Sequence, residues 1–186
     1  MSGVDLAILL ATSGHSGVDT VMRNLAAEVH ARGVALNALR VGGHGPAWEE
    51  VLPTEVVVPL GSAHVDTSLL PLVRYLRRVR PRVLLTDKDR VNRMAVVARA
   101  LAGSRTRLVL RVGTTFSKNL ERRHPLHRRL QYLSARLLYP RADAVIVPSR
   151  GAAADLAAAA RIPPGRIHPL ASPVVTPRVL ERARER

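Results

Sequence analysis

Residues 10–36 read LATSGHSGVDTVMRNLAAEVHARGVAL and indicate the end of a strand, a glycine-bearing loop, an amphipathic helix and the start of a second strand. The run at 4–11 is almost continuously apolar, as expected of a strand buried on both faces of a sheet. Gly33 ends the helix, in which apolar residues recur at helical spacing: Val18, Val21, Met22, Leu25, Ala26 and Val29. A strand that leads through glycines into a helix N-terminus is a frequent site for phosphate.

Strands and helices are expected to alternate along the rest of the chain. Apolar runs predict further strands at 34–41, 54–60, 82–86, 106–113, 142–149 and within 165–175. Helical patterns occupy 69–79, 91–103, 117–139 and 150–160, with Pro125 interrupting the third. This alternation predicts an α/β fold, a doubly wound parallel sheet of Rossmann-like type, in a single domain over 1–175. Residues 176–186 are expected to form an exit or linker segment.

The charge of the chain indicates an anionic partner. The formal net charge is +15, almost all of it from arginine, since Lys88 and Lys118 are the only lysines. Arginine suits phosphate and carboxylate, although a GC-rich genome would also favour arginine over lysine. The absence of cysteine excludes disulfides and thiolate chemistry. The chain shows neither a signal peptide nor an apolar run of about 20 residues, which predicts a cytoplasmic protein.

A basic chain could also bind nucleic acid or a dinucleotide. The aromatic content is only 3% and forms no stacking platform, so no specific nucleic-acid partner is expected. Gly14 and Gly17 lack the third glycine of a dinucleotide fingerprint, and there is no Walker motif. Arg40 at the end of the second predicted strand could still meet a 2′-phosphate. A noncatalytic nucleotide- or phosphate-binding module, NADP-like, therefore remains an alternative.

Three stretches resemble the N-terminal half of GT-B glycosyltransferases of family 4: residues 14–36, LRVGTTFSKNLERRHPLHRRL at 110–130, and YPRADAVIVPSRGAAADLAAAARIPPGRIHPLASPVV at 139–175. The resemblance implies a hexosyltransferase-like, retaining enzyme that takes a sugar from a nucleotide-sugar donor without a metal or other cofactor. It implies a hydroxyl acceptor on a cell-envelope glycan or a lipid-linked glycan. Relatives hold most of the donor in a C-terminal domain, so this chain is expected to be a fragment with little activity alone.

Candidate binding residues lie where strands end, because ligands of an open parallel sheet bind outside the carboxyl ends of its strands. For the donor phosphate or sugar the candidates are Gly14, His15, Ser16 and Gly17. For the acceptor they are Asp87, Lys88, Arg111, Thr114, Thr115, Ser149 and Arg150. Helix capping is the competing role for Asp89, for the residues at 114–117 and for Ser149.

No catalytic or metal-binding residue is assigned. Many relatives carry a histidine in the loop after the fifth strand, where Gly113 and Thr114 stand here, so a histidine-based catalytic role has no candidate. The seven histidines show no ligand spacing, and no metal site is expected.

The segment 117–141 is basic and amphipathic, with arginines interleaved with leucines. Such a segment is typical of a helix that lies on an anionic membrane surface. This favours a peripheral location at the inner face of the membrane. The alternative is an ordinary helix whose leucines pack on the sheet while its arginines face solvent.

Overall fold

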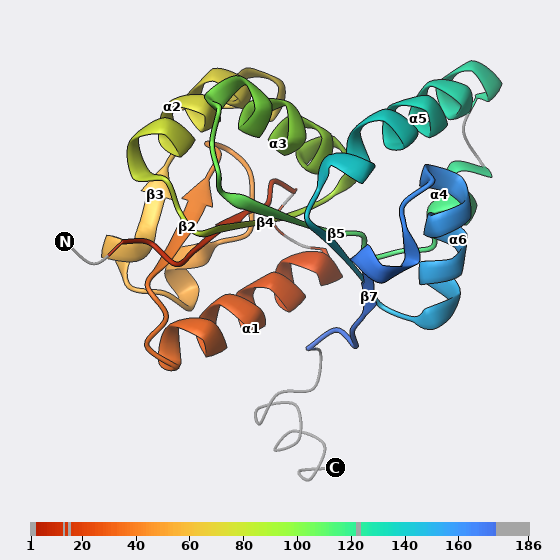
Figure 1. Cartoon of the computed structure of the whole chain (residues 1–186). Coiled ribbons are helices and arrows are strands. Elements are labelled where there is room, and N and C mark those ends of the chain that lie inside the picture. Colours follow the sequence, from red (N-terminus) through yellow and green to blue (C-terminus); the bar gives the residue numbers. More distant parts are fainter. Residues whose placement is uncertain (1–2, 13, 15, 122–123, 174–186) are drawn as a thin grey trace, which may run out of the picture.

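The computed structural model describes residues 3–12, 14, 16–121 and 124–173. Within them, seven parallel strands form one sheet in the order β3-β2-β1-β4-β5-β6-β7 (Figure 1). The strands are β1 (Leu6–Leu9), β2 (Leu36–Arg40), β3 (Val57–Pro59), β4 (Val83–Asp87), β5 (Arg107–Arg111), β6 (Ala144–Val147) and β7 (Ile167–Pro169). The predicted parallel α/β sheet is confirmed. The predicted linker at 176–186 lies outside the described residues.

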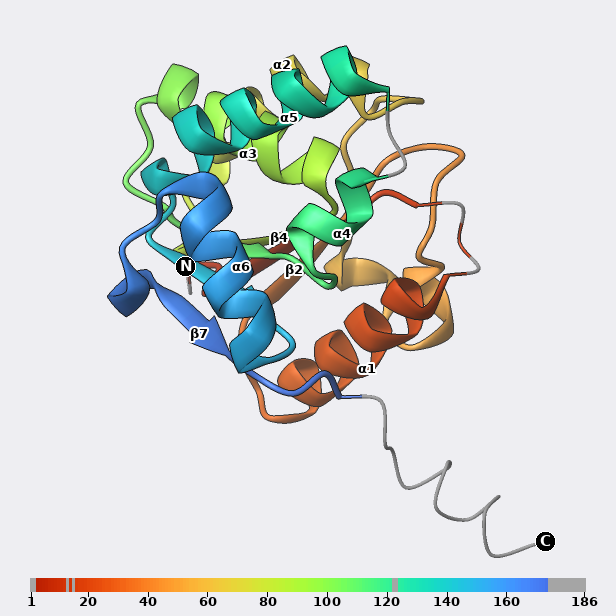
Figure 2. The same cartoon turned by 90° about the vertical axis from the view of Figure 1, so that its right-hand side faces the viewer.

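Helices cover both faces of the sheet. They are α1 (Gly17–Ala31), α2 (Leu69–Val79), α3 (Asp89–Ala102), α4 (Phe116–Glu121), α5 (Pro125–Leu138) and α6 (Arg150–Ala160). Helix α1 lies on one face, and α2, α3 and α5 lie on the other (Figures 1 and 2). This arrangement follows from short right-handed crossovers between parallel strands, which place successive helices against the sheet.

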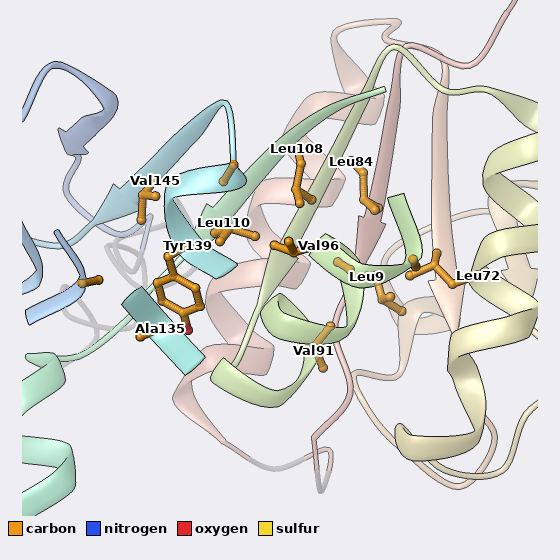
Figure 3. Close-up of a cluster of buried hydrophobic side chains, with 14 of the residues drawn as sticks. Leu9, Leu72, Leu84, Val91, Val96, Leu108, Leu110, Ala135, Tyr139 and Val145 are labelled. Atoms are coloured by element: carbon orange, nitrogen blue, oxygen red, sulfur yellow. The ribbon is translucent and has the colours of Figure 1, made fainter. Parts of the chain in front are cut away.

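Two hydrophobic cores hold these layers together. On the α1 side, Ile8 and Leu10 of the β1 region pack with Met22 and with the fully buried Trp48. On the other side, the larger core joins α2, α3, α5 and α6 to the sheet, and Figure 3 shows Leu84 and nine other labelled members. The central strands are apolar on both faces because both faces are covered.

Some local predictions are corrected by the structure. The third strand is shorter than predicted, because residues Thr54–Val56 form a 3₁₀ turn before β3. Asp89 was a candidate cap for a helix starting near residue 91, but α3 begins at Asp89 itself.

The basic segment forms two helices, α4 and α5, with Pro125 at the first position of α5. The alternative in which the leucines of this segment pack on the sheet is wrong for four of them. Leu126, Leu130, Leu133 and Leu137 are each more than half exposed, at 62%, 55%, 55% and 53%. In the described part of the chain, no helix combines the length and the apolar character needed to cross a membrane.

Candidate functional site

The strand order reverses between β1 and β4, from which successive strands are added in opposite directions. In open parallel sheets, the crevice outside the carboxyl ends of the strands at such a reversal is the usual place for a ligand. The turn into α1 follows β1, and the neighbouring β4 ends at Asp87, which Lys88 follows. The predicted donor and acceptor loops therefore lie side by side at one edge of the sheet.

The turn between β1 and α1 is organised by the carboxylate of Asp19, which is 1% exposed. It accepts hydrogen bonds from the Ser16 backbone N–H (2.8 Å), from the Ser16 hydroxyl and from the Thr12 hydroxyl. Burial by itself raises the pKa of Asp19, but these hydrogen bonds outweigh burial and hold the pKa below its ordinary value. The Ser16 amide, a candidate for the donor, is thus already paired within the chain.

Gly17 is the exposed first residue of α1. A Cβ placed on it would meet no atom within 4 Å, so the packing of this chain does not require glycine there. The first N–H groups of a helix have no acceptor inside the helix, and its N-terminus favours negative charge. Gly17 therefore leaves room for an anionic group to approach these amides. His15 lies outside the described residues.

A second loop supports this turn, and sequence reasoning missed its role. Thr12 and Gly45 exchange two backbone hydrogen bonds (3.1 and 3.0 Å). A Cβ on Gly45 would lie 2.2 Å from the Cα of Gly14, which itself has a φ of +90°. Only glycine permits this approach. The three glycines after the second strand were the signal, but the sequence did not show which backbone they would meet.

This second loop also encloses a shallow hollow of about 630 Å³ beside Gly14. Two ion pairs line it, Arg23 with Glu50 and Arg40 with Glu49. The Arg40 guanidinium, which could have met a 2′-phosphate, is therefore engaged with a carboxylate. To bind a 2′-phosphate, Arg40 would have to break its ion pair with Glu49.

Asp87 and Arg111 form a buried ion pair at the ends of β4 and β5, with their residues 2% and 8% exposed. Arg111 also donates to the Ser172 hydroxyl (2.7 Å), which follows β7, and Asp87 accepts the Lys88 N–H (2.6 Å). Burial raises the pKa of Asp87, and the adjacent guanidinium opposes that rise. The charges of these two candidate residues are directed at each other, so the pair holds the edge of the sheet in place.

A cavity of about 140 Å³ opens beside this pair. Four acceptor candidates line it together, Asp87, Lys88, Arg111 and Thr114, and Val18 from the first turn of α1 also borders it. Gly14, in the turn before α1, thus borders the larger hollow, and Val18, in the first turn of α1, borders this cavity. A binding site at the reversal in strand order would include the turn before α1, the cavity and the hollow.

Lys88 has an unusual backbone at this cavity. Its φ of +73° and ψ of 132° lie in a region that side chains other than glycine rarely adopt. Backbone strain of this kind costs about 1–3 kcal/mol and is concentrated at functional sites. Among the residues that the structure describes, this strained residue is also the one lysine of the cavity lining.

Sequence reasoning missed the polar residues beneath the cavity. Asn92 is fully buried, accepts from the Thr86 hydroxyl (2.7 Å) and donates to the Arg111 carbonyl (2.9 Å). The Tyr139 hydroxyl donates to Asp89 (2.6 Å), and burial raises the pKa of this tyrosine well above its ordinary value. The sequence signal was a polar residue in the first turn of a helix, on the same face as the apolar Ala95 and Val96, but such a residue often faces solvent.

The remaining acceptor candidates do not line the cavity. The Thr115 carbonyl accepts the Asn119 N–H (3.2 Å) at the start of α4. The Ser149 hydroxyl accepts the Ala152 N–H (3.1 Å), so Ser149 is the N-cap of α6. Arg150 is exposed at the first position of that helix.

The cavity lining combines the carboxylates of Asp87 and Asp89 with ammonium, hydroxyl and amide groups, which suits a ligand rich in hydroxyls. Its volume is below the roughly 300–1,000 Å³ of pockets that enclose a small molecule, so it can receive only part of a ligand. Among the described residues, no group of three or more His, Asp or Glu side chains could hold a metal ion.

Three solved structures share this fold. The apo form of the lipopolysaccharide outer core galactosyltransferase WaaB is 16% identical, with a TM-score of 0.65 over 91% of this chain and 46% of its own. HepE of Anabaena, in complex with UDP and glucose, is 15% identical, with a TM-score of 0.65 over 97% of this chain and 49% of its own. MurG of Acinetobacter baumannii is 10% identical, with a TM-score of 0.54 over 93% of this chain and 46% of its own.

Such low identities show a shared fold, and this chain spans about half the length of each of those proteins. No curated protein matches the sequence. The model of Glycosyltransferase Family 4 matches residues 15–177, which include Gly17, the Asp87–Arg111 pair and Thr114. On that match, the chain belongs to glycosyltransferase family 4.

Proposed function

We propose that the carboxyl edge of this sheet is the acceptor side of a glycosyltransferase active site and also borders the donor's diphosphate or sugar. The observation that carries the proposal is the meeting of the α1 N-terminus with the cavity lined by Lys88, Arg111 and Thr114, at the reversal in strand order. Family membership supplies the class of reaction. The donor is a nucleotide-sugar, by likeness to HepE, whose structure holds UDP and glucose.

The residues have separate roles in this proposal. The helix N-terminus at Gly17 accepts negative charge from the donor. Lys88 and Thr114 bind acceptor hydroxyls. The buried Asp87–Arg111 ion pair next to them holds these two residues in position. Ser16 supports the turn through Asp19 and does not touch the donor. We assign no catalytic residue and no cofactor.

The acceptor class is a cell-envelope glycan or a lipid-linked glycan, and the configuration at the anomeric carbon is retained, both by family resemblance. A cavity that receives only part of a ligand is consistent with a binding site that a second domain completes. We therefore propose that a further domain holds most of the nucleotide and that the 186-residue chain alone transfers sugar poorly. The proposed location is the cytoplasm.

The test is sugar transfer from a panel of UDP- and GDP-sugars to glycan and lipid-linked acceptors. It is carried out with the 186-residue chain and with the longest polypeptide that its gene encodes. The expected result is turnover by the longer polypeptide only, lowered at least about tenfold by Gly17→Ala, which corresponds to one lost anion contact at a helix N-terminus. Rapid turnover by the 186-residue chain would contradict the proposal that a further domain holds most of the nucleotide.

A thermal-shift panel separates this proposal from the NADP-like alternative. UDP, GDP and NADP are added singly to the chain. Stabilisation by UDP or GDP supports the transferase, since binding to the native state raises its apparent stability. Stabilisation by NADP alone would favour the noncatalytic module, although Arg40 is already paired with Glu49.

A further inference from the structure

Helix α5 presents a row of leucines to the outside. Leu126, Leu130, Leu133 and Leu137 follow the i, i+4, i+7, i+11 spacing of one helix face, and each is more than half exposed. At about 100° per residue, the four span only about 60° around the helix axis. We call them the leucine row. Scattered exposed leucines are ordinary, but a contiguous row marks an interaction surface.

The leucine row faces directly away from the protein. Ala135 is fully buried and packs in the larger core, as labelled in Figure 3. At about 100° per residue it lies on the opposite side of α5 from the centre of the row. Figure 1 shows α5 at the upper right, where its first turn is the part farthest from the strands. The row therefore points away from the sheet and from the candidate site at its carboxyl edge.

The charges around the leucine row are of one sign. Helix α5 contains Arg128, Arg129 and Arg136 and no acidic residue. Arg129 is exposed at the border of the row, about 40° around the helix axis from Leu133, whereas Arg128 is exposed on the opposite side of α5. Arg136 donates to the Ala159 carbonyl of α6 (3.0 Å). The whole chain carries a formal charge of +15. Two copies meeting through this face would bring like charges together, which opposes self-association.

We propose that α5 docks on an anionic lipid surface, with the leucine row in the acyl boundary and Arg129 at the headgroups. Exposed leucines on one face with arginines at its border are the pattern of helices that lie in a membrane interface. Each arginine near such a surface adds attraction, and its aliphatic stem can lie along apolar groups.

Docking would also place the membrane near the candidate site. Gln131 and Tyr139, at the middle and just past the end of α5, line the 140 Å³ cavity together with residues of α4. A membrane under α5 would thus lie one helix away from the acceptor side. The inference extends the proposed function by naming a partner, but vesicle binding needs no sugar transfer, so each can fail without the other.

The first experiment measures sedimentation of the chain with phosphatidylcholine vesicles, either pure or containing about 30% phosphatidylglycerol. The expected result is binding to the anionic vesicles that is several-fold stronger than to the neutral ones and is largely lost at about 0.5 M NaCl, because salt screens the attraction. Equal binding to both vesicles, or none to either, would overturn the proposal.

Two pairs of variants locate the surface. Leu130→Ser with Leu133→Ser is expected to weaken vesicle binding at least about tenfold, whereas Leu101→Ser in α3, which removes a leucine 52% exposed, should leave it unchanged. Arg129→Gln should remove part of the preference for anionic lipid. Arg105→Gln with Arg107→Gln, at the opposite edge of the sheet, should not.

Circular dichroism and the melting temperature of each variant show that the fold is kept. Serine variants that keep full vesicle binding would exclude the leucine row as the docking surface.

A spin label reports the depth of the row directly. Because the chain contains no cysteine, Leu133→Cys can be labelled at a single position, with Leu101→Cys as the control. Oxygen accessibility at residue 133 should rise on adding anionic vesicles and stay constant at residue 101. Immobilisation of the label at residue 133 without lipid, growing with protein concentration, would show instead that a second copy covers the row and would overturn the proposal.

Discussion

Asp87 and Arg111 stand opposite each other in the register of β4 and β5, and their side chains form a buried ion pair where both strands end. The Asp87→Asn variant keeps the shape of the side chain but leaves the Arg111 guanidinium buried without a counter-charge. Losing one member of a buried pair costs about 3–5 kcal/mol. Denaturant unfolding should show a loss of this size in the free energy of unfolding.

The double variant Asp87→Asn with Arg111→Met is the control for this effect. It removes both charges and should lose less stability than the sum of the two single variants, since no uncompensated charge remains. A single Asp87→Asn variant as stable as the wild type would show that the pair does not hold the edge of the sheet.

Gly17 and Gly45 should respond oppositely to alanine. Gly17→Ala adds a Cβ into open space at the start of α1 and should leave the stability unchanged or slightly raised, while lowering binding of the donor. Gly45→Ala places its Cβ 2.2 Å from the Cα of Gly14, so the turn must shift, at a cost of several kcal/mol. Thermal melts and nucleotide-sugar titrations of both variants separate the two roles. Equal melting temperatures would contradict the packing of the two loops.

Lys88 is expected to trade stability for function. Lys88→Gly relieves a φ of +73° and should stabilise the chain by about 1 kcal/mol. If the ammonium group binds an acceptor hydroxyl, the same variant should raise the KM for the acceptor. Lys88→Met, which keeps the strain and removes the charge, should raise the KM without the gain in stability. A gain in stability with unchanged transfer kinetics would assign Lys88 no part in binding.

The fold was predictable because each strand and helix carries its own local signal. The apolar run before Gly14 indicates a strand, and the helical spacing that ends at Gly33 indicates a helix. Both signals are independent of where the rest of the chain lies. The site was predictable only in part. The sheet brings Asp87, Lys88, Arg111 and Thr114 to one cavity, as the rule for parallel strands implies. The approach of Gly45 to Gly14 and the burial of Asn92 depend on how distant segments pack, which no local pattern encodes.

The leucines of α5 illustrate the same limit. A helix with alternating arginines and leucines predicts an amphipathic element, but the pattern does not tell which face meets the sheet. In the structure the small Ala135 faces the core and the leucine row faces outward. The core next to α5 is filled by Tyr139, just past the end of the helix, and by residues of other helices. Only the tertiary fold brings these residues together.

The carboxylate of Asp19 should make the stability of the chain depend on acid. Hydrogen bonds from Ser16 and Thr12 hold its pKa below the ordinary value of 3.8. A carboxyl group whose pKa is lower in the folded state stabilises the fold above its unfolded pKa and loses that contribution as the pH falls through the folded pKa. Asp19→Asn should therefore cost about 1–3 kcal/mol near pH 7, as expected for hydrogen bonds to a charged group, and progressively less below about pH 4. Urea unfolding over this range measures the gap between the two proteins, and Asp66→Asn, at a carboxylate 71% exposed, is the control. A gap that stays constant with pH would mean that Asp19 acts through its shape alone and that the turn before Gly17 does not depend on its charge.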